Sequence, residues 1–131
     1  MIKVLHIDSK KAYTLCNNSL HRPSEADQRF VDLSREVSRP FMDAGQLGAI
    51  VRELLELGGY IAVAEVATDN LDAAYRDTNH IDCAWQQNEA VTALAQEARS
   101  SSVGDVFIHD GTAYVVASFG FERLDGLEVV V

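Results

Sequence analysis

The feature that most constrains the fold of this chain is a β-hairpin pattern in its last third. Residues 103–108 and 113–119 are rich in branched and aromatic side chains, and the dipeptide Asp110-Gly111 lies between them. An Asp-Gly pair between two such runs is a strong signal for a tight turn between antiparallel strands. The sequence therefore predicts a hairpin centred on this dipeptide.

Two further patterns extend the predicted sheet. Residues 121–124 and 127–131 flank a second Asp-Gly pair and predict another hairpin. Residues 60–67 form a nearly continuous apolar run, which is typical of a strand covered on both faces. We therefore expect an antiparallel sheet built mainly from residues 103–131 and joined by the strand near 60–67. A short strand is also expected at residues 2–7.

Amphipathic helices are predicted earlier in the chain. Residues 24–38 carry apolar side chains at helical spacing, and Ser24 is a suitable N-cap. Residues 46–58 have the clearest apolar stripe, which ends at Gly58. A shorter helix is expected after Asn70, which can cap it.

Two stretches carry weaker patterns. Residues 8–23 contain turn signals, so we expect a loop or one irregular turn. Within residues 86–99 the apolar spacing fits a helix, but a run of serines follows, and the pattern does not decide between helix and loop. The fold class expected for residues 1–131 is a single α+β domain, with the sheet covered on one face by two or three helices.

The composition is that of a globular protein. A length of 131 residues fits one domain that can bury a core, and 47% of the residues are hydrophobic. No apolar run approaches the roughly 20 residues that a membrane-spanning helix needs. The N-terminus lacks the pattern of a secretion signal. We therefore expect a cytoplasmic protein that does not bind a membrane.

The net charge of −9 is distributed unevenly. Residues 1–39 have seven basic residues (Lys and Arg) and five acidic residues (Asp and Glu), whereas residues 40–131 have four basic and fifteen acidic residues. An acidic field repels phosphate backbones, so we expect no direct nucleic-acid binding, and it attracts basic protein surfaces. Solubility alone is the simpler explanation. The residues that we expect to form an acidic surface are Glu53, Glu56, Asp69, Asp72 and Asp77.

A polar segment at residues 75–88 contains the only tryptophan of the chain. An aromatic anchor among polar side chains is typical of a protein-binding surface. The alternative is a loop whose polar side chains satisfy their own backbone. The spacing fixes no third metal ligand beside His80 and Asp82, so we expect neither a metal nor a cofactor. The candidate partner-binding residues are Tyr75, Asn79, His80, Asp82, Trp85 and Asn88.

Motifs for nucleophilic catalysis are weak in this chain. It has no Gly-x-Ser-x-Gly elbow, and the serines at 100–102 lack the lysine of a phosphate-binding loop. We interpret the serine run as part of a turn in which Gly104 has an unusual backbone angle and Asp105 starts the following strand. The alternative is a small enzyme or ligand-binding domain built on the polar cluster of His80, Asp82, Asn88 and Ser101.

Part of the chain resembles a known family. The matching residues lie between 75 and 124 and comprise Thr78-Asn79-His80-Ile81-Asp82, Trp85, Asn88, the run from Arg99 to Val106, Gly111, Tyr114, Val116 and Gly120-Phe121. They resemble a pattern in small phage, plasmid and bacterial proteins and in the YodL-like domain of large mobile-element proteins. Those proteins are associated with antirestriction, and the resemblance implies an accessory protein of a phage or mobile element. It supplies no catalytic residues.

These observations together give a functional hypothesis. We expect a non-enzymatic accessory protein that binds and inhibits a host protein, with a defence system of the CRISPR or restriction type as the target class. The contact would be made by the acidic surface or the polar segment. An assembly role is a further alternative, because exposed edges of a small sheet could pair across a homodimer.

Overall fold

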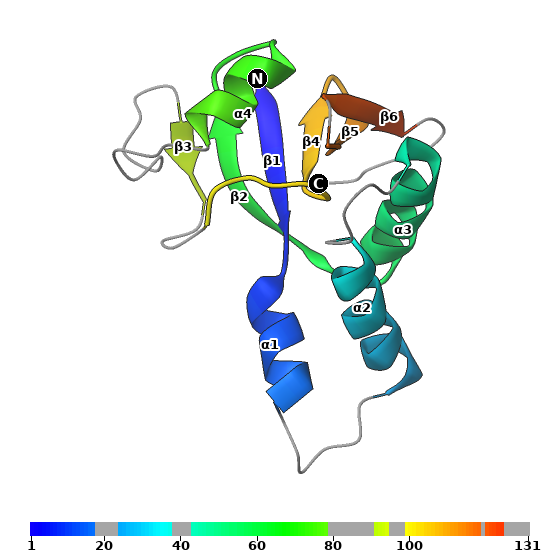
Figure 1. Ribbon diagram of the computed structural model, residues 1–131. Coiled ribbons are helices and arrows are strands. Elements are labelled where there is room, and N and C mark those ends of the chain that lie inside the picture. Colours follow the sequence, from blue (N-terminus) through cyan, green and yellow to red (C-terminus); the bar gives the residue numbers. More distant parts are fainter. Residues whose placement is uncertain (18–23, 38–42, 79–90, 95–98, 119, 125–131) are drawn as a thin grey trace.

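The N-terminal strand β1 (Ile2–Ile7) lies inside an antiparallel sheet (Figure 1). The computed structural model describes residues 1–17, 24–37, 43–78, 91–94, 99–118 and 120–124. Within these residues the sheet has six strands in the order β3-β2-β1-β4-β5-β6. The other strands are β2 (Tyr60–Val66), β3 (Val91–Ala93), β4 (Val106–His109), β5 (Thr112–Val116) and β6 (Phe121–Leu124). An α+β fold is thereby confirmed.

The predicted hairpin around Asp110 and Gly111 is confirmed. The two residues have φ angles of 49° and 77°, and His109 on β4 pairs with Thr112 on β5. Two consecutive positive φ values favour an Asp-Gly pair and match the twist of the strands. Strand β6 continues the sheet beside β5, and its proposed partner at residues 127–131 lies outside the described residues.

The strand predicted near 60–67 is also confirmed and pairs directly with β1. Ile2 lies opposite Val66, Ile7 lies opposite Tyr60, and the register shifts between Val4 and Leu5. Side chains alternate along β1, so Ile2 and Val4 face one side of the sheet while Leu5 and Ile7 face the other. Both sets are buried, which makes β1 a strand with two covered faces.

Helices α2 (Glu25–Glu36) and α3 (Ala44–Glu56) confirm the two main helical predictions. The Ser24 and Asp43 side chains accept hydrogen bonds from backbone N–H groups in the first turns of these helices, as N-caps do. Both helices bury their apolar stripes against the face of the sheet that carries Leu5 and Ile7. The buried helical side chains are Phe30, Val31, Leu33, Leu47, Val51 and Leu54.

The opposite face is covered by the short helix α4 (Leu71–Asp77). Its N-cap is Asn70, as predicted, and the Asn70 side chain accepts a hydrogen bond from the Ala73 N–H group at 3.1 Å. Ala74 packs with Ile2 and Val4 in a second apolar cluster. The helices therefore lie on both faces of the sheet, with α4 near the N-terminus and α2 and α3 beside each other across the sheet (Figure 1).

Two predictions need correction. The loop predicted over residues 8–23 is wrong for α1 (Ser9–Asn17), where Asp8 accepts hydrogen bonds from the Lys11 and Ala12 N–H groups and so starts a helix. In the undecided stretch at 86–99, residues 91–93 form β3 because they pair with β2. Residues 86–90 and 95–98 lie outside the described residues.

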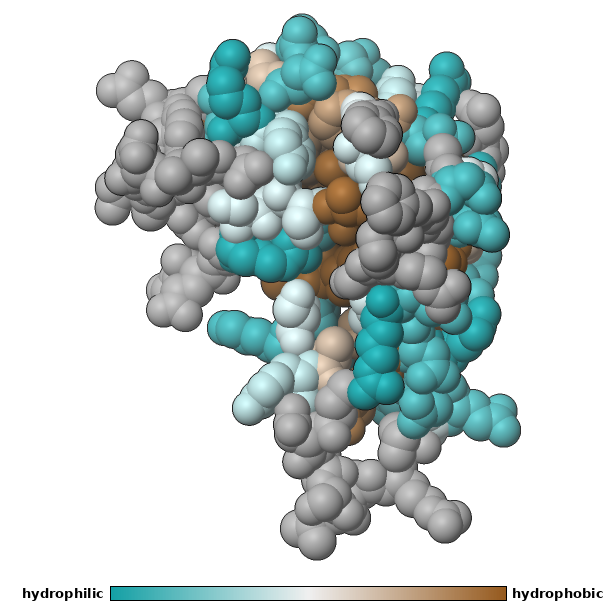
Figure 2. Space-filling view, in the orientation of Figure 1, coloured by the Kyte–Doolittle hydropathy of each residue, from teal (hydrophilic) through white to brown (hydrophobic). Residues whose placement is uncertain are grey.

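The surface view is consistent with this layered arrangement. Hydrophilic residues cover most of the coloured surface in Figure 2, and hydrophobic residues are visible in a narrow strip near its centre. Among the described helices, none has the length and apolarity needed to cross a bilayer.

Candidate functional site

Four buried polar residues form a cluster on the face of the sheet that α4 covers. We call His6, Thr78, Ser101 and Asp105 the buried polar cluster, and their exposed fractions are 2%, 0%, 2% and 0%. His6 lies on β1 and faces the same side as Ile2 and Val4, because side chains alternate along a strand. Thr78 is the C-cap of α4, and the other two members belong to the loop that precedes β4. The fold thus brings together residues that are distant in sequence.

Ser101 is at the centre of this cluster. Its hydroxyl oxygen lies 2.9 Å from His6 Nε2 and 2.8 Å from Thr78 Oγ1, and its backbone N–H donates to the Thr78 carbonyl at 3.0 Å. Thr78 Oγ1 also lies 2.8 Å from the Ala74 carbonyl oxygen, which can only accept. Thr78 and Ser101 are therefore joined through both their backbones and their side chains.

The directions of these hydrogen bonds follow from the number of protons available. A threonine hydroxyl has one proton, and here it is donated to the Ala74 carbonyl. Thr78 must then accept the proton of Ser101, and Ser101 in turn accepts from His6 Nε2–H. This chain of bonds assigns the Nε2–H tautomer to His6. In this state His6 is a donor to the serine and has no lone pair on Nε2 with which to remove its proton.

A catalytic triad requires a different arrangement. Its histidine accepts the nucleophile proton on one ring nitrogen, while the carboxylate binds the other nitrogen. Asp105 Oδ2 lies 3.7 Å from Nε2 of His6, the nitrogen that already faces Ser101. The Ser101 side chain is also closed to solvent. The serine, histidine and aspartate of this cluster therefore serve to hold the fold together.

Asp105 accepts hydrogen bonds from several directions. Its two carboxylate oxygens lie 2.6 Å and 2.8 Å from Arg99 Nη1 and Nη2, in the paired geometry that makes such contacts strong. The backbone N–H groups of Ile7 and Ser102 also donate to it, at 3.1 Å and 2.8 Å. These bonds fold residues 99–105 into a turn that is joined to β1.

The same turn is held by glycine and tyrosine. Gly104 has a φ of 94°, which confirms the predicted unusual backbone angle, and its N–H donates to the Val116 carbonyl at 2.9 Å. The Tyr60 hydroxyl donates to the Gly104 carbonyl at 2.6 Å. Burial, together with the charge of Asp105, raises the pKa of Tyr60 well above its ordinary value. The tyrosine therefore remains a neutral donor.

Burial also determines the charge of His6. Removal from water lowers its pKa from 6.5 to about 4, the nearby Asp105 opposes this shift, and Arg99 adds to it. His6 is thus neutral at pH 7, in agreement with its hydrogen bonds. Bonding to Asp105 raises the pKa of Arg99, so the guanidinium stays charged at neutral pH.

The predicted partner-binding residues are only partly described. Tyr75 is half-buried on α4, and its ring meets that of Phe121 edge to face at 6.5 Å. Tyr75 is therefore partly committed to the core. The remaining residues predicted for this surface lie outside the described residues and comprise Asn79, His80, Asp82, Trp85 and Asn88.

The predicted acidic residues do not share one face. Glu53 and Glu56 lie on α3, which packs on one side of the sheet, whereas Asp69, Asp72 and Asp77 lie at or on α4, on the other side. Glu53 is paired with Arg29 at 2.6 Å, and this contact lowers the pKa of Glu53.

The α4 side also contains neutralising contacts. The N-terminal ammonium and His109 lie 3.1 Å and 3.3 Å from Asp69 Oδ1, and both lower the pKa of Asp69. Asp77 Oδ1 lies 3.8 Å from Arg76 Nε. Asp72 and Asp77 lie on α4 together with Tyr75, the one predicted partner-binding residue that the structure describes.

Sequence reasoning missed the buried polar cluster as a unit. The signals were a single histidine within an apolar strand and the run Arg99-Ser100-Ser101-Ser102-Val103-Gly104-Asp105, but nothing in the sequence links the two. Among the described residues, no group of three or more His, Cys, Asp or Glu side chains could hold a metal ion. Comparison with known proteins returns no family model, curated protein or solved structure that matches this chain.

Proposed function

We propose that this chain is a non-enzymatic protein that binds a host protein through the part of the polar segment that follows α4, residues 79–88. The observation that carries this proposal is the joining of Thr78 and Ser101, the residues on either side of 79–100. We call these two residues the anchor pair. Binding residues are often found on loops that a rigid scaffold positions, and the anchor pair provides such a scaffold.

The segment is attached to the sheet at more than its ends. Strand β3 pairs with β2, where Val91 lies opposite Val66 and Ala93 lies opposite Ala64. The Leu94 N–H donates to the Val63 carbonyl at 2.9 Å. The described residues that flank positions 79–90, namely Thr78 and the strand β3, are therefore both attached to the core. Fixing the ends of a loop in the free protein reduces the entropy that is lost when it binds a partner.

The residue types in this segment suit a protein contact. Trp85 is the natural anchor, because tryptophan is enriched among residues that dominate interface energies. Asp72 is exposed in the first turn of α4, the helix that precedes the segment in the chain, and adds negative charge to that helix. A basic surface is the complementary partner, and its charge would accelerate association.

The buried polar cluster supports a binding role over a catalytic one. Within the described residues, the serine, histidine and carboxylate that lie together are closed to solvent and bonded to one another. The alternative that uses Ser101 in a catalytic or ligand-binding cluster is weakened, because its hydroxyl already contacts His6 and Thr78. The resemblance of residues 75–124 to mobile-element proteins suggests a host defence enzyme as the target class.

Capture of partners from host lysate tests this proposal. The protein is immobilised beside Trp85→Ala and Tyr13→Ala, and bound proteins are quantified by mass spectrometry. Tyr13 is a matched control because it is an aromatic residue on α1 that is 72% exposed. We expect one stoichiometric partner that Trp85→Ala loses and Tyr13→Ala keeps. A partner retained by Trp85→Ala would contradict the proposal.

Thr78→Val tests the role of the anchor pair. Valine has nearly the shape of threonine but no hydroxyl, so the side-chain hydrogen bonds to Ser101 and Ala74 are lost, while the backbone bond to Ser101 and the core volume are preserved. We expect partner affinity to fall several-fold at a temperature where circular dichroism shows a folded protein. Unchanged affinity in this folded variant would show that the anchor pair does not prepare the segment for binding.

A further inference from the structure

The hairpin turn between β4 and β5 contains the one described residue other than glycine that has a positive φ angle. This residue is Asp110, at 49°, and Gly111 follows it at 77°. The last pair of the ladder is His109 with Thr112, so the two turn residues lie beyond the hydrogen-bonded strands. The Asp110 side chain is 88% exposed, and a Cβ atom placed on Gly111 would meet no described atom within 4 Å. Both turn residues are therefore open to water.

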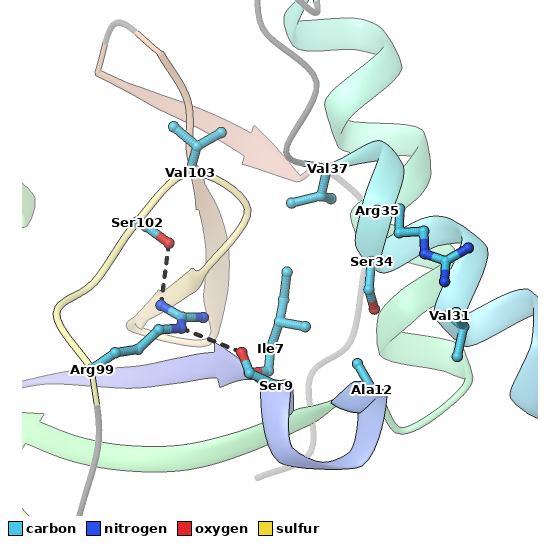
Figure 3. A pocket seen from close by; sticks show the side chains of 10 residues that line it. All are labelled: Ile7, Ser9, Ala12, Val31, Ser34, Arg35, Val37, Arg99, Ser102 and Val103. Atoms are coloured by element: carbon cyan, nitrogen blue, oxygen red, sulfur yellow. Dashed lines mark hydrogen bonds between the residues drawn. The ribbon is translucent and has the colours of Figure 1, made fainter. Parts of the chain in front are cut away.

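The other aspartate beside β4 is held in a different way. Asp105 is fully buried and accepts hydrogen bonds from Arg99 and from two backbone N–H groups. Arg99 is in turn directed toward Ser9 and Ser102, at one side of a pocket that lies between α1, α2 and this turn (Figure 3). The polar groups at that side of the pocket thus already contact one another. Asp105 is fixed by its partners, whereas the Asp110 side chain extends into solvent.

An aspartate that is followed by glycine can react with its own backbone. The Gly111 nitrogen attacks Cγ of Asp110 and loses its proton, and one carboxylate oxygen leaves as water with that proton and one more, which gives a five-membered succinimide ring. Water then adds to either ring carbonyl and opens the ring. Breaking the bond from nitrogen to Cγ restores aspartate, whereas breaking the bond from nitrogen to the former backbone carbonyl gives isoaspartate. One water is released and one is consumed, with no oxidation or reduction.

The positive φ angle of Asp110 suits this ring. Ring closure holds the ψ angle of the reacting residue at about −120°, which is the value that a type II′ turn has at its first central position together with a positive φ. Types I′ and II′ both join antiparallel strands through two residues. Asp110 is the first of the two residues between His109 and Thr112, and its φ is already positive. The ring can therefore form by rotation about ψ while β4 and β5 remain paired, and Gly111 has the backbone freedom to follow.

His109 lies where it can supply the second proton to the departing oxygen. Its Nε2 is 3.3 Å from Asp69 Oδ1 and 3.6 Å from Asp110 Oδ2. Both neighbours are carboxylate oxygens, which only accept, so the imidazole carries a proton on Nε2. Histidine is the side chain that most often transfers protons to reacting groups. Because Asp110 is exposed, rotation of its side chain can close the remaining distance, and protonated His109 then donates and recovers a proton from water.

We propose that Asp110 isomerises to isoaspartate in the folded protein, because the hairpin turn presents it in an open conformation with positive φ next to His109. The product carries one additional CH₂ group in the backbone of a two-residue turn. It thus changes the geometry that sets the register of β4 and β5. This inference concerns the end of the hairpin and does not depend on the proposed protein partner.

Incubation of the purified protein at pH 7 for several weeks, followed by digestion and mass spectrometry, tests the proposal. The isolated peptide of residues 104–117 gives the rate without the fold. Asp72, which is exposed in the first turn of α4, is the internal control. We expect isoaspartate to form at Asp110 at least as fast in the folded protein as in the peptide, and much more slowly at Asp72. Slower formation at Asp110 in the folded protein than in the peptide, or equal rates at the two aspartates, would overturn the proposal.

Two variants separate the contributions of the glycine and the histidine. Gly111→Asn adds a side chain beside the attacking nitrogen and tolerates the positive φ, and His109→Gln removes the proton donor. We expect both to slow the isomerisation of Asp110 several-fold in the folded protein, whereas in the peptide only Gly111→Asn should slow it. In water enriched in heavy oxygen, each isoaspartate should contain one heavy oxygen atom from the opening of the ring. An unchanged rate in His109→Gln, equal slowing in the peptide, or isoaspartate without the label would contradict this route.

Discussion

Replacing Asp105 by asparagine tests most sharply how the turn before β4 is held. The carboxylate is fully buried and accepts from Arg99 twice, from the Ile7 N–H and from the Ser102 N–H. The asparagine side chain has one acceptor oxygen in place of two, and its NH₂ group would face N–H donors with which it cannot form hydrogen bonds. At least two of the four bonds are therefore lost, and the Arg99 charge remains partly buried without its counter-ion.

The expected cost follows from these losses. Removing one partner of a buried ion pair costs about 3–5 kcal/mol, which is a large part of the roughly 5–15 kcal/mol that stabilises a domain. For a chain of this length we expect the melting temperature to fall by about 10–20 °C. Thermal and urea unfolding at pH 7, followed by circular dichroism, measure both quantities.

Asp110→Asn is the matched control for this substitution. Asp110 lies in the hairpin turn with its side chain 88% exposed, and asparagine tolerates the same positive φ. We expect this variant to remain within about 0.5 kcal/mol of the wild type. A loss below about 1 kcal/mol for Asp105→Asn, or equal losses for the two variants, would refute the role assigned to Asp105.

Three further predictions concern the core and its titration. The pKa of His6 is about 4 in the folded protein and 6.5 in the unfolded chain, so neutral His6 contributes fully to the free energy of unfolding above pH 6.5, and about 3 kcal/mol of that free energy is lost as the pH falls to 4. Urea unfolding from pH 7 to 4 should show a smaller loss of stability for His6→Gln than for the wild type. An identical dependence of stability on pH in the two proteins would contradict this prediction. Gly104→Ala should lower the free energy of unfolding by about 2–5 kcal/mol in urea, because φ at this position is 94° and a Cβ atom would overlap Val37. Gly111→Ala adds backbone strain without an overlap, so it should lower that free energy by less. A larger loss for Gly111→Ala than for Gly104→Ala would be inconsistent with this packing. Leu54→Ala should cost about 2–5 kcal/mol, since Leu54 is fully buried in α3, and thermal unfolding that is unchanged would contradict its place in the core.

Local patterns in the sequence predicted most of the secondary structure. The turn at Asp110 and Gly111 and the caps at Ser24 and Asn70 depend on a few neighbouring residues, so the sequence is sufficient to find them. The apolar stripe of α3 has the 3.6-residue period that a single buried face requires. Helix α1 was missed because the turn signals within residues 8–23 outweighed the local cap at Asp8, and because its burial comes from packing against the next helix, α2.

The buried polar cluster could not be predicted in the same way. The contact between His6 and Ser101 spans 95 positions, and that between Thr78 and Ser101 spans 23. Only the pairing of β1 with β4, together with the position of α4, brings these residues to one place.

We propose that the segment between the anchor pair is a protein-binding surface. The most direct test is the affinity of the purified captured partner for the wild type, Trp85→Ala and Tyr13→Ala, measured by titration calorimetry. Removing an aromatic anchor from an interface costs about 2 kcal/mol or more, so we expect Trp85→Ala to bind about 30-fold more weakly or worse. Tyr13→Ala should bind as the wild type does. Equal affinity of the wild type and Trp85→Ala would show that this segment does not bind the partner.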